Sequence, residues 1–485
     1  MKKFIVLAVI VLLCVASWAG ATYFVGANVQ SRYTGLIDQY GHFGPFTLTT
    51  QSYDKGFLES RAQTVVEIRV PQSPSEDGQE NAEDAVSFVF EHTFRHGPLP
   101  LGASGQQTGG PALALVETRL VSFSADEEDF EKLLAEIPAL AEPFAFSKIA
   151  LDGSVRSRVT IPAFENQSEG NLVRWGGFTL ESQAGPDMKT LMGTFDMPKM
   201  ELIMADGRLT WNGISGRFDL AETLPMLYVG TSQASFGVMD MSFIDKQSGQ
   251  LKTMQMKGFE VASDSSVDGT LVRYEQTLEF GGVTVEGETF GPGVLEIEMN
   301  NLDGEALSSF QGQVQDLYRD SDSFNPEELV GRMLPLYLQL FQNLAAGNPE
   351  LTIRKLHFAT PQGDVDGRVR VKLDGNAGAA AGNPAALLQS LDAEADLSVA
   401  ESLARSLAKD TIRQNLMGAR ERGDFPPYSD EEIANLVEQQ VDGQIDGLLA
   451  QNFLVSDGAN LKASATFSNG ELVLNGTLLP LFQGQ

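Results

Sequence analysis

The feature that most constrains this fold is an alternation of apolar or small side chains with polar ones, which recurs along the chain. It is clear over residues 58–70, where Glu and Arg alternate with Leu, Ala, Val and Ile. Successive side chains of a β-strand point to opposite faces of a sheet, so this period predicts strands. Further strands are predicted over 86–94, 113–123, 155–161, 191–195, 209–218, 271–280, 294–299, 351–358, 369–373, 461–467 and 472–478.

Asp-Gly and Asn-Gly pairs punctuate these runs and predict tight hairpin turns. The turn that suits twisted antiparallel strands needs positive φ at both central residues, which Asn, Asp and Gly tolerate best. The pairs begin at Asp152, Asp206, Asp268, Asp303, Asp366, Asp374 and Asn469. We therefore expect a β-rich α+β fold with one large antiparallel sheet, or several joined sheets, and helices interspersed among the strands.

Helical spacing interrupts the alternation at several places. Ser124 and Glu127 have the spacing of a capping box, and so have Ser429 and Glu432. Asn325 is a candidate cap that precedes a proline and two glutamates, residues typical of a first helical turn. Helices are predicted over 124–137, 307–317, 325–344, 403–416 and 433–449.

The predicted helix over 329–344 is apolar nearly all round, and Pro335 should bend it. A helix of this kind is usually buried, so we expect it to pack against the sheet as part of the core. The alternative is that it lines a groove for an acyl chain or a partner helix.

A basic start and a long apolar run open the chain. Lys2 and Lys3 precede a stretch from Phe4 to Val25 without charge, and the next basic residue is Arg32. A run of more than about 18 apolar residues can cross a bilayer as a helix. Because basic residues favour the cytoplasmic side, we expect a single-pass inner-membrane protein whose soluble part lies in the periplasm.

We interpret residues 1–27 as a retained membrane anchor. A cleaved signal peptide is the alternative, since Ala19-Gly20-Ala21 has the small-x-small form of a cleavage site. A lipid anchor on Cys14 is not expected, because Leu13 stands where a small residue is required. The rest is divided into a β-rich region over 28–300 and a mixed helix and strand region over 301–485, which ends in a hairpin.

Charge and cysteine content exclude several classes of protein. The 485 residues include 65 acidic and 34 basic side chains, a formal net charge of −31. Binding to nucleic acid requires a basic surface, so we expect no nucleic-acid partner. One cysteine and four histidines do not suffice for a zinc finger, a haem-attachment motif or a disulfide framework.

The motifs of known catalytic classes are missing. The chain has no Walker A loop, no Gly-x-Ser-x-Gly elbow and no His-Glu-x-x-His motif. His92 and His96 lie at the end of an alternating run, where four residues of extended chain span about 13 Å, too far for one metal ion. Asp320-Ser321-Asp322 resembles an EF-hand start, but Phe324 and Asn325 replace an oxygen ligand and the glycine. We therefore assign no catalytic, cofactor-binding or metal-ligating residue and expect no cofactor.

Four motifs, in this order along the chain, resemble those of a known family. The basic-apolar start contains Trp18 near its end and is followed by Tyr33. Residues 53–60 (YDKGFLES), 96–101 (HGPLPL) and 469–476 (NGELVLNG) are similar to an aromatic-x-basic-Gly-Phe strand, a His-Gly-Pro signature and a closing Gly-x-Leu-x-Leu-Asn-Gly. By these motifs the chain resembles the YdgA family of Gram-negative envelope proteins, whose function is not established.

This resemblance implies proteins that are held by an N-terminal inner-membrane segment, with a periplasmic body of unknown activity and no catalytic residue to transfer. His96-Gly97-Pro98 has a structural interpretation, because Gly permits close backbone approach and Pro ends a strand ladder. A functional role for His96 is the alternative.

Two functional hypotheses follow. The favoured one is a membrane-anchored periplasmic envelope protein without catalytic machinery that binds a lipid-like ligand or another envelope component. Its architecture also looks like that of AsmA-type envelope proteins, a fold-level analogy. The alternative is a periplasmic hydrolase that uses an acidic pair or His96.

Overall fold

The computed structural model describes residues 22, 26, 28–38, 41–43, 46–69, 85–100, 110–123, 142–168, 170–245, 248–319, 326–374, 389–421 and 429–479. Within these residues the protein is a β-rich α+β fold built on antiparallel strand pairs, as the alternation predicts. Contacts divide the chain into two compact units. Unit 1 contains the chain up to Ser232 and Leu307–Gln339, and unit 2 contains Gln233–Ala306 and Leu340–Gln485.

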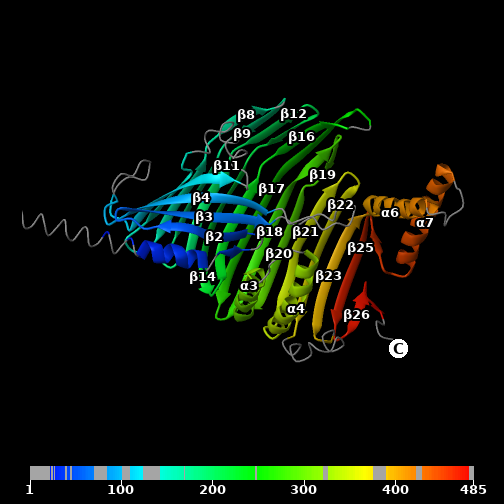
Figure 1. The fold of residues 1–485 in the computed structure, drawn as a ribbon. Coiled ribbons are helices and arrows are strands. Elements are labelled where there is room, and N and C mark those ends of the chain that lie inside the picture. The colour runs from blue at the N-terminus through cyan, green and yellow to red at the C-terminus, as the bar shows by residue number, and fades with distance from the viewer. Residues whose placement is uncertain are drawn as a thin grey trace, which may run out of the picture. The chain divides into compact units, whose positions relative to one another are not determined.

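The strands of unit 1 form a long antiparallel sheet (Figure 1). They are β1 (His42–Phe43), β2 (Phe46–Asp54), β3 (Glu59–Arg69), β4 (Ala85–His96), β5 (Ala114–Phe123), β6 (Ala145–Ile149), β7 (Val155–Ile161), β8 (Phe164–Ser168), β9 (Asn171–Trp175), β10 (Phe178–Ala184), β11 (Thr190–Met197), β12 (Met200–Met204), β13 (Gly207–Trp211) and β14 (Ile214–Leu224), after which β15 (Leu227–Phe236) carries the chain past Ser232. The pairing order is β1–β2–β3–β4–β5–β6–β7–β10–β11–β14.

Two hairpins of unit 1 leave this order and pair with each other. The β8–β9 hairpin pairs with the β12–β13 hairpin through β9 and β12. The single strand predicted over 209–218 is therefore wrong, because β13 ends at Trp211 and β14 begins at Ile214. Gly213 lies between them with a φ of 93°, and a Cβ there would approach the Met197 carbonyl oxygen to 3.1 Å. Glycine allows both the positive φ and the close approach.

A helix over residues 28–38 packs on β3, β4 and β5 of unit 1. Val29 on this helix is 1% exposed and lies in one cluster with Ala62, Phe94 and Ala114. The small Ala side chains let the helix approach the strands closely, so the segment after the predicted anchor is joined to the sheet by apolar packing.

The strands of unit 2 form an antiparallel meander. They are β16 (Met239–Ile244), β17 (Leu251–Asp268), β18 (Leu271–Val285), β19 (Glu288–Phe290), β20 (Gly293–Asp303), β21 (Glu350–Thr360), β22 (Gly363–Leu373), β23 (Leu391–Ala400), β24 (Val455–Asp457), β25 (Asn460–Ser468), β26 (Glu471–Leu474) and β27 (Thr477–Leu479). The pairing order is β16–β17–β18–β20–β21–β22–β23–β25–β26–β27, while β19 pairs with β18 and β24 with β25.

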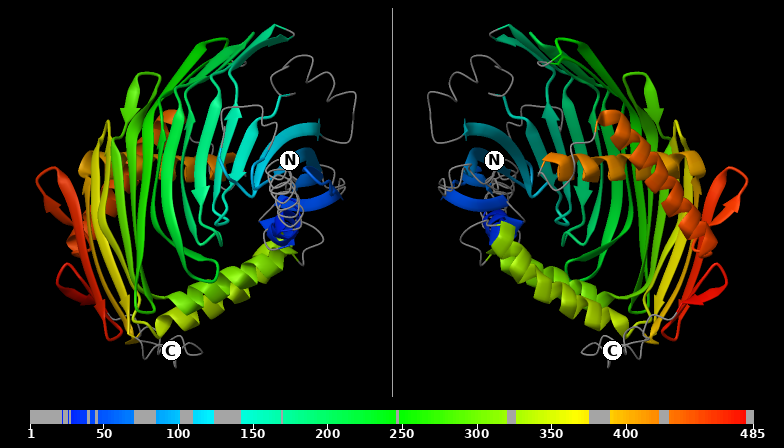
Figure 2. Two further views of the ribbon diagram at one scale, coloured as in Figure 1. Left: turned by 90° about the vertical axis from the view of Figure 1, so that its left-hand side faces the viewer. Right: turned by 90° about the vertical axis from the view of Figure 1, so that its right-hand side faces the viewer.

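Two helical pairs interrupt the succession of strands. They are α3 (Gly304–Arg319) with α4 (Pro326–Ala345), and α6 (Glu401–Glu421) with α7 (Asp430–Ala450). Figure 2 shows α3 beside α4, where the rings of Phe310 and Tyr337 lie 5.3 Å apart. The capping box predicted for α7 is present, since Glu432 N donates to Ser429 Oγ at 3.3 Å and Ser429 N donates to Glu432 Oε2 at 2.8 Å. The helices predicted over 307–317, 325–344, 403–416 and 433–449 are confirmed.

The Asp-Gly and Asn-Gly pairs have several different roles. Asp268 and Asn469 lie at hairpin turns, as predicted. Asp303 instead caps α3, because its Oδ1 accepts a hydrogen bond from Ala306 N at 2.8 Å. The turn predicted at Asp366 is wrong, since Asp366 and Gly367 lie inside β22 and pair with both neighbouring strands.

Some predictions concern residues outside the described ranges. These include the helix over 124–137 and the anchor over 1–27, of which only residues 22 and 26 are described. Among the residues that are described, no helix has both the length and the apolar character needed to cross a bilayer.

The α6–α7 pair offers a test of helical packing. Val441 and Ile445 of α7 are at most 4% exposed and share one cluster with Ile412 and Leu416 of α6. Ile445→Ala should lower the local free energy of unfolding by about 2–5 kcal/mol, because it leaves a cavity. Hydrogen exchange of the α7 amides measures this loss. Leu407→Ala, at a site that is 58% exposed, is the control and should change it by less than about 0.5 kcal/mol.

Candidate functional site

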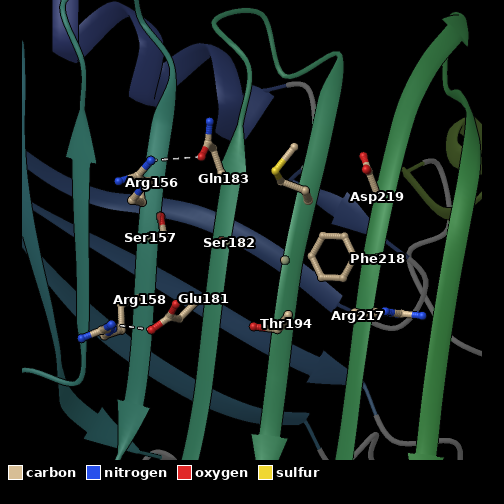
Figure 3. Close-up of a pocket in the computed structure, with 12 residues that line it drawn as sticks. Arg156, Ser157, Arg158, Glu181, Ser182, Gln183, Thr194, Arg217, Phe218 and Asp219 are labelled. Carbon is tan, nitrogen blue, oxygen red and sulfur yellow. Dashed lines mark hydrogen bonds and ion pairs between the residues drawn. The ribbon is translucent and has the colours of Figure 1, made fainter.

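A shallow hollow of about 590 Å³ lies over β7, β10, β11 and β14 of unit 1 (Figure 3). Cross-strand register arranges eight of its lining side chains, all polar except Met192, in two rows. The rows are Arg156, Gln183, Met192 and Asp219, and Arg158, Glu181, Thr194 and Arg217. Catalysis in such a hollow would require a desolvated acid, base or nucleophile.

The charges that line this hollow are exposed and partly compensated. Arg158 forms an ion pair with Glu181, whose side chain is 52% exposed. Arg156 Nη2 donates to Gln183 Oε1 at 3.2 Å. Solvent screens exposed ion pairs of this kind, so each contributes little to stability. None of the residues that line the hollow is fully buried, so the hollow lacks the desolvated group that such catalysis would require.

One buried glutamate of unit 1 is paired with two arginines whose side chains are exposed. The side chain of Glu201 is 4% exposed, and its Oε2 accepts a hydrogen bond from Arg174 Nη1 at 3.1 Å. Arg208 forms an ion pair with the other carboxylate oxygen. The hydrogen bonds from these guanidiniums lower the pKa of Glu201 below its usual range. An ionised, fully paired carboxylate of this kind acts as a structural group.

A pair of facing carboxylates occurs in unit 2. Glu275 and Glu298 are direct cross-strand neighbours on β18 and β20. Arg273 and Arg354 lie within ion-pair distance of both carboxylates. The hydrogen bond from Asn300 and the two arginines lower the pKa of Glu298, so its carboxylate is held in the ionised, arginine-paired form. In the described part of the chain, no group of three or more His, Cys, Asp or Glu could hold a metal ion.

Three of the four family-like motifs meet in unit 1, at a place that we call the motif corner, formed by Tyr33, residues 53–60 and residues 96–99. The ring of Tyr33 lies 5.7 Å from that of Tyr53 and 5.6 Å from that of Phe94. His96 N donates to the carbonyl oxygen of Leu58 at 2.9 Å. The motifs are distant in sequence, and helix packing and strand pairing bring them together.

The side chain of His96 is enclosed in the motif corner. The residue is 2% exposed, and its Nδ1 donates to the carbonyl oxygen of Phe57 at 3.1 Å. Nε2 has no hydrogen-bond partner among the described residues. Burial lowers the pKa of His96, and a Cβ on Gly26 would lie 2.7 Å from the ring. The neutral ring therefore fills the space between β4 and the segment that precedes the first described helix.

Gly97 shows the close backbone approach that the sequence predicts. A Cβ at this position would lie 1.6 Å from the carbonyl oxygen of Ala112. Gly97 N donates to the carbonyl oxygen of Leu113 at 2.7 Å, and Ala112 N donates to that of Pro98 at 3.1 Å. Because only glycine fits here, the structural interpretation of His96-Gly97-Pro98 accounts for its geometry.

His92 lies in β4, as its predicted strand requires, and both of its ring nitrogens contact hydroxyl groups. Nε2 is 2.8 Å from Thr64 Oγ1, and Nδ1 is 2.8 Å from Thr118 Oγ1. Tyr33 extends this series of hydrogen-bonded side chains, since its hydroxyl is 2.8 Å from Thr64 Oγ1. Burial lowers the pKa of His92 to about 4, so the ring is neutral and orders the interior of unit 1.

The fourth motif lies in unit 2 and is explained by turn geometry. Asn469 and Gly470 have positive φ angles of 54° and 79° at the β25–β26 turn. Asn475 Oδ1 accepts a hydrogen bond from Ser464 N at 2.8 Å, and its Nδ2 donates to the carbonyl oxygen of Asn452 at 2.8 Å. The Asn side chain thus joins the strand end to the chain after α7, which is a structural role.

The sheet of unit 2 carries an extended apolar side, which we call the apolar face. It consists of Leu278, Phe280, Leu295, Ile297, Met299, Leu351, Ile353, Leu356, Phe358, Val365, Val369, Val371, Ala395, Leu397, Val399, Leu461, Ala463 and Ala465, on β18, β20, β21, β22, β23 and β25. One cross-strand row runs from Leu278 through Leu295, Leu356, Gly367 and Leu397 to Ala463.

Among the residues that the structure describes, much of the apolar face has no second layer over it, although α6 and α7 cover it at Leu461. Leu351 and Leu397 are 40% and 44% exposed. In β21 no residue is fully buried, whereas a sheet side covered by another layer has residues close to zero exposure. The opposite side is polar, with pairs such as Arg370 and Glu350, whose atoms Nε and Oε1 lie 2.9 Å apart.

Helix α4 adds a second uncovered apolar surface. Its half-buried side carries Leu329, Met333, Leu336, Leu340 and Leu344, in the spacing of one helical face. The exposed side carries Val330, Leu334, Tyr337, Leu338 and Phe341, which we call the α4 stripe and which is 49–69% exposed. The expectation of a core helix therefore holds for one side only, and Pro335 lies within the helix as predicted.

Sequence reasoning found the motifs but not the surfaces. The EF-hand-like residues 320–325 and Cys14 lie outside the described residues. The α4 stripe could have been suspected from the all-round apolar pattern, whereas the uncovered state of the apolar face has no sequence signal. The expectation that the chain has no catalytic residue is not tested by these observations and stays a prediction.

These features describe a β-rich protein with an uncovered apolar sheet side and no evident catalytic machinery in its described part. The model of a family described as a bacterial protein of unknown function, DUF945, matches residues 1–482. The chain therefore belongs to this family. It is 23% identical to Protein YdgA of Escherichia coli (strain K12) over 506 aligned residues, which cover 99% of this chain and 95% of that protein. A shorter match, 29% identical over 114 residues and 22% of each chain, is to Uncharacterized protein YihF of the same organism.

Gly97→Ala tests the backbone approach in the motif corner. The new Cβ would collide with the Ala112 carbonyl, so β4 and β5 must separate and the yield of folded protein should fall. Circular dichroism and resistance to proteolysis measure this. Gly443→Ala in α7, where a Cβ meets no atom within 4 Å, is the control and should retain the fold. Equal behaviour of the two variants would contradict the structural role of Gly97.

His92 should make stability depend on pH. In the folded protein its pKa is lowered to about 4, whereas an unfolded imidazole titrates near 6.5. Between these values the unfolded state binds more protons, so stability falls as the pH drops from about 6.5 to 4, by on the order of 3 kcal/mol. Urea unfolding as a function of pH should show this slope, and His92→Gln should reduce it. An unchanged slope in the variant would exclude His92 as its source.

Proposed function

We propose that this protein is a membrane-tethered periplasmic binding protein that holds the acyl chains of a lipid-like ligand against the apolar face of unit 2. The observation that carries the proposal is that the apolar face is continuous across strands and, away from Leu461, which is 3% exposed and packs with α6 and α7, includes exposed side chains such as Leu351 and Leu397. Acyl chains offer no hydrogen-bonding groups, and they match a surface whose only attraction is apolar.

The extent of the apolar face supports a chain-like ligand. The row from Leu278 to Ala463 crosses six paired strands, and neighbouring strands lie about 4.8 Å apart. An exposed apolar surface of this extent on a soluble body normally marks a binding site. The α4 stripe is a second surface of the same chemistry, so one ligand class can explain both.

The tether is supported by the N-terminal sequence. The uncharged run from Phe4 to Val25 is long enough to span a bilayer, and Lys2 and Lys3 favour a cytoplasmic start. Folding of the body against residues 28–38 then keeps it at the periplasmic side of the membrane. A hydrolase has less support, because the described acidic pairs are neutralised by arginines and His96 is enclosed.

Site-specific photo-crosslinking tests ligand binding. A benzophenone amino acid replaces Leu351 or Leu397 on the apolar face, in cells whose phospholipids carry radioactive phosphate. We expect light-dependent transfer of the label to the protein, since these side chains are 40% and 44% exposed on the proposed binding surface. The full chain is then isolated from membranes and the adduct identified by mass spectrometry.

Thr352 and Ser398 provide matched controls, because each is the strand neighbour of one test position and points to the opposite side. They should yield little label. Equal labelling from both sides, or no labelling at Leu351 and Leu397, would contradict lipid binding. A protein adduct at Leu397 instead of a lipid adduct would favour another envelope component as the ligand.

A further inference from the structure

The motif corner leaves three large apolar side chains in solvent. Phe57 is 48% exposed, Leu58 46% and Leu99 52%. Phe57 and Leu58 lie in the turn between β2 and β3 (Figure 1). Leu99 follows β4 at the same end of these strands, because Glu59 at the start of β3 pairs with Arg95 near the end of β4. We call these three side chains the apolar tip. The neighbouring motif residues His96, Gly97 and Ser60 are buried or closely packed. The motif corner as a whole is therefore well packed, and the exposure is confined to Phe57, Leu58 and Leu99.

The apolar tip lies one side chain away from Gly26, the residue that follows the apolar N-terminal run in the sequence. Gly26 contacts the His96 ring, and a Cβ on Gly26 would lie only 2.7 Å from it. His96 in turn binds the carbonyl oxygens of Phe57 and Leu58, at 3.1 Å and 2.9 Å. The chain therefore passes from a bilayer-length apolar sequence directly to the tip, with a single side chain between them.

We propose that Phe57, Leu58 and Leu99 insert into the interfacial layer of the phospholipid bilayer in which the N-terminal segment is anchored. This inference rests on the membrane tether proposed above. Since the anchor ends against His96, the tip must lie near the bilayer surface, and apolar side chains in the interface are stabilised by removal from water.

The charges around the tip permit this contact. Lys55 precedes the turn, and its side chain carries a positive charge, which lipid phosphate attracts. Glu59 has ion-pair partners in Arg61 at 3.1 Å and Arg95 at 3.8 Å, so its negative charge is compensated. Asp54 is opposite Arg61 in the β2–β3 register. A body with a net charge of −31 is otherwise repelled by anionic lipid, so this locally compensated edge is suited to approach the membrane.

Spin labelling of the full chain tests the inference. Cys14→Ser removes the only native thiol, and Phe57→Cys or Leu99→Cys then provides one labelling site. The chain is reconstituted in vesicles of phosphatidylethanolamine and phosphatidylglycerol. We expect the label at both sites to collide several-fold more often with oxygen, which partitions into lipid, than with a water-soluble nickel chelate.

Phe46→Cys is the matched control, because Phe46 is a 39% exposed aromatic residue at the other end of β2, about 26 Å from Asp54 along the strand. Its label should favour the nickel chelate. If the chain sediments with vesicles but the Phe57 and Leu99 labels are as accessible to nickel as that at Phe46, tip insertion is wrong and the tether stands. If the chain does not sediment with vesicles, both are wrong. Labels shielded from both reagents would indicate a protein contact and would also overturn insertion.

Discussion

Backbone hydrogen bonding between antiparallel strands is the interaction on which the rest of this structure depends. In unit 2 each strand from β16 to β23 has its N–H and C=O groups satisfied mainly by its neighbours. A sheet that satisfies its polar backbone in this way does not need a second layer for that purpose. It can therefore expose an apolar side, which a globular fold with a closed core would bury. Each Å² of that side covered by a ligand contributes about 25 cal/mol.

The motif corner shows a different kind of constraint. Here a glycine, an enclosed histidine and small alanines allow a helix and three strands to approach one another closely. The residues that resemble the family motifs are divided between the two roles: His96 and Gly97 are structural, while Phe57, Leu58 and Leu99 point into solvent. Close packing in the corner holds this exposed set in a defined position near Gly26.

The fold was predicted from the sequence wherever local signals were strong. Alternation located β3, β4, β7, β18 and β25, and the Ser429–Glu432 capping box located the start of α7. The long strand β17 was missed, because its half-buried side includes Lys252, Ser263 and Ser265 as well as methionines, and this mixture hides the period. Asp366 was assigned to a turn because its dipeptide suits one, but pairing with β21 and β23 keeps it in a strand. Tertiary pairing outweighs local turn preference at such positions.

By itself, the sequence determined which residues alternate, where helices begin, and that the chain opens with a basic and apolar segment. These properties depend on neighbours within a few positions, so local chemistry is sufficient to define them. Only the tertiary structure decided that the apolar face and the α4 stripe are uncovered, that distant motifs meet around His96, and that the acidic pairs carry arginine partners. Burial and pairing of this kind depend on residues far apart in the chain, and no local pattern records whether an apolar side is finally covered.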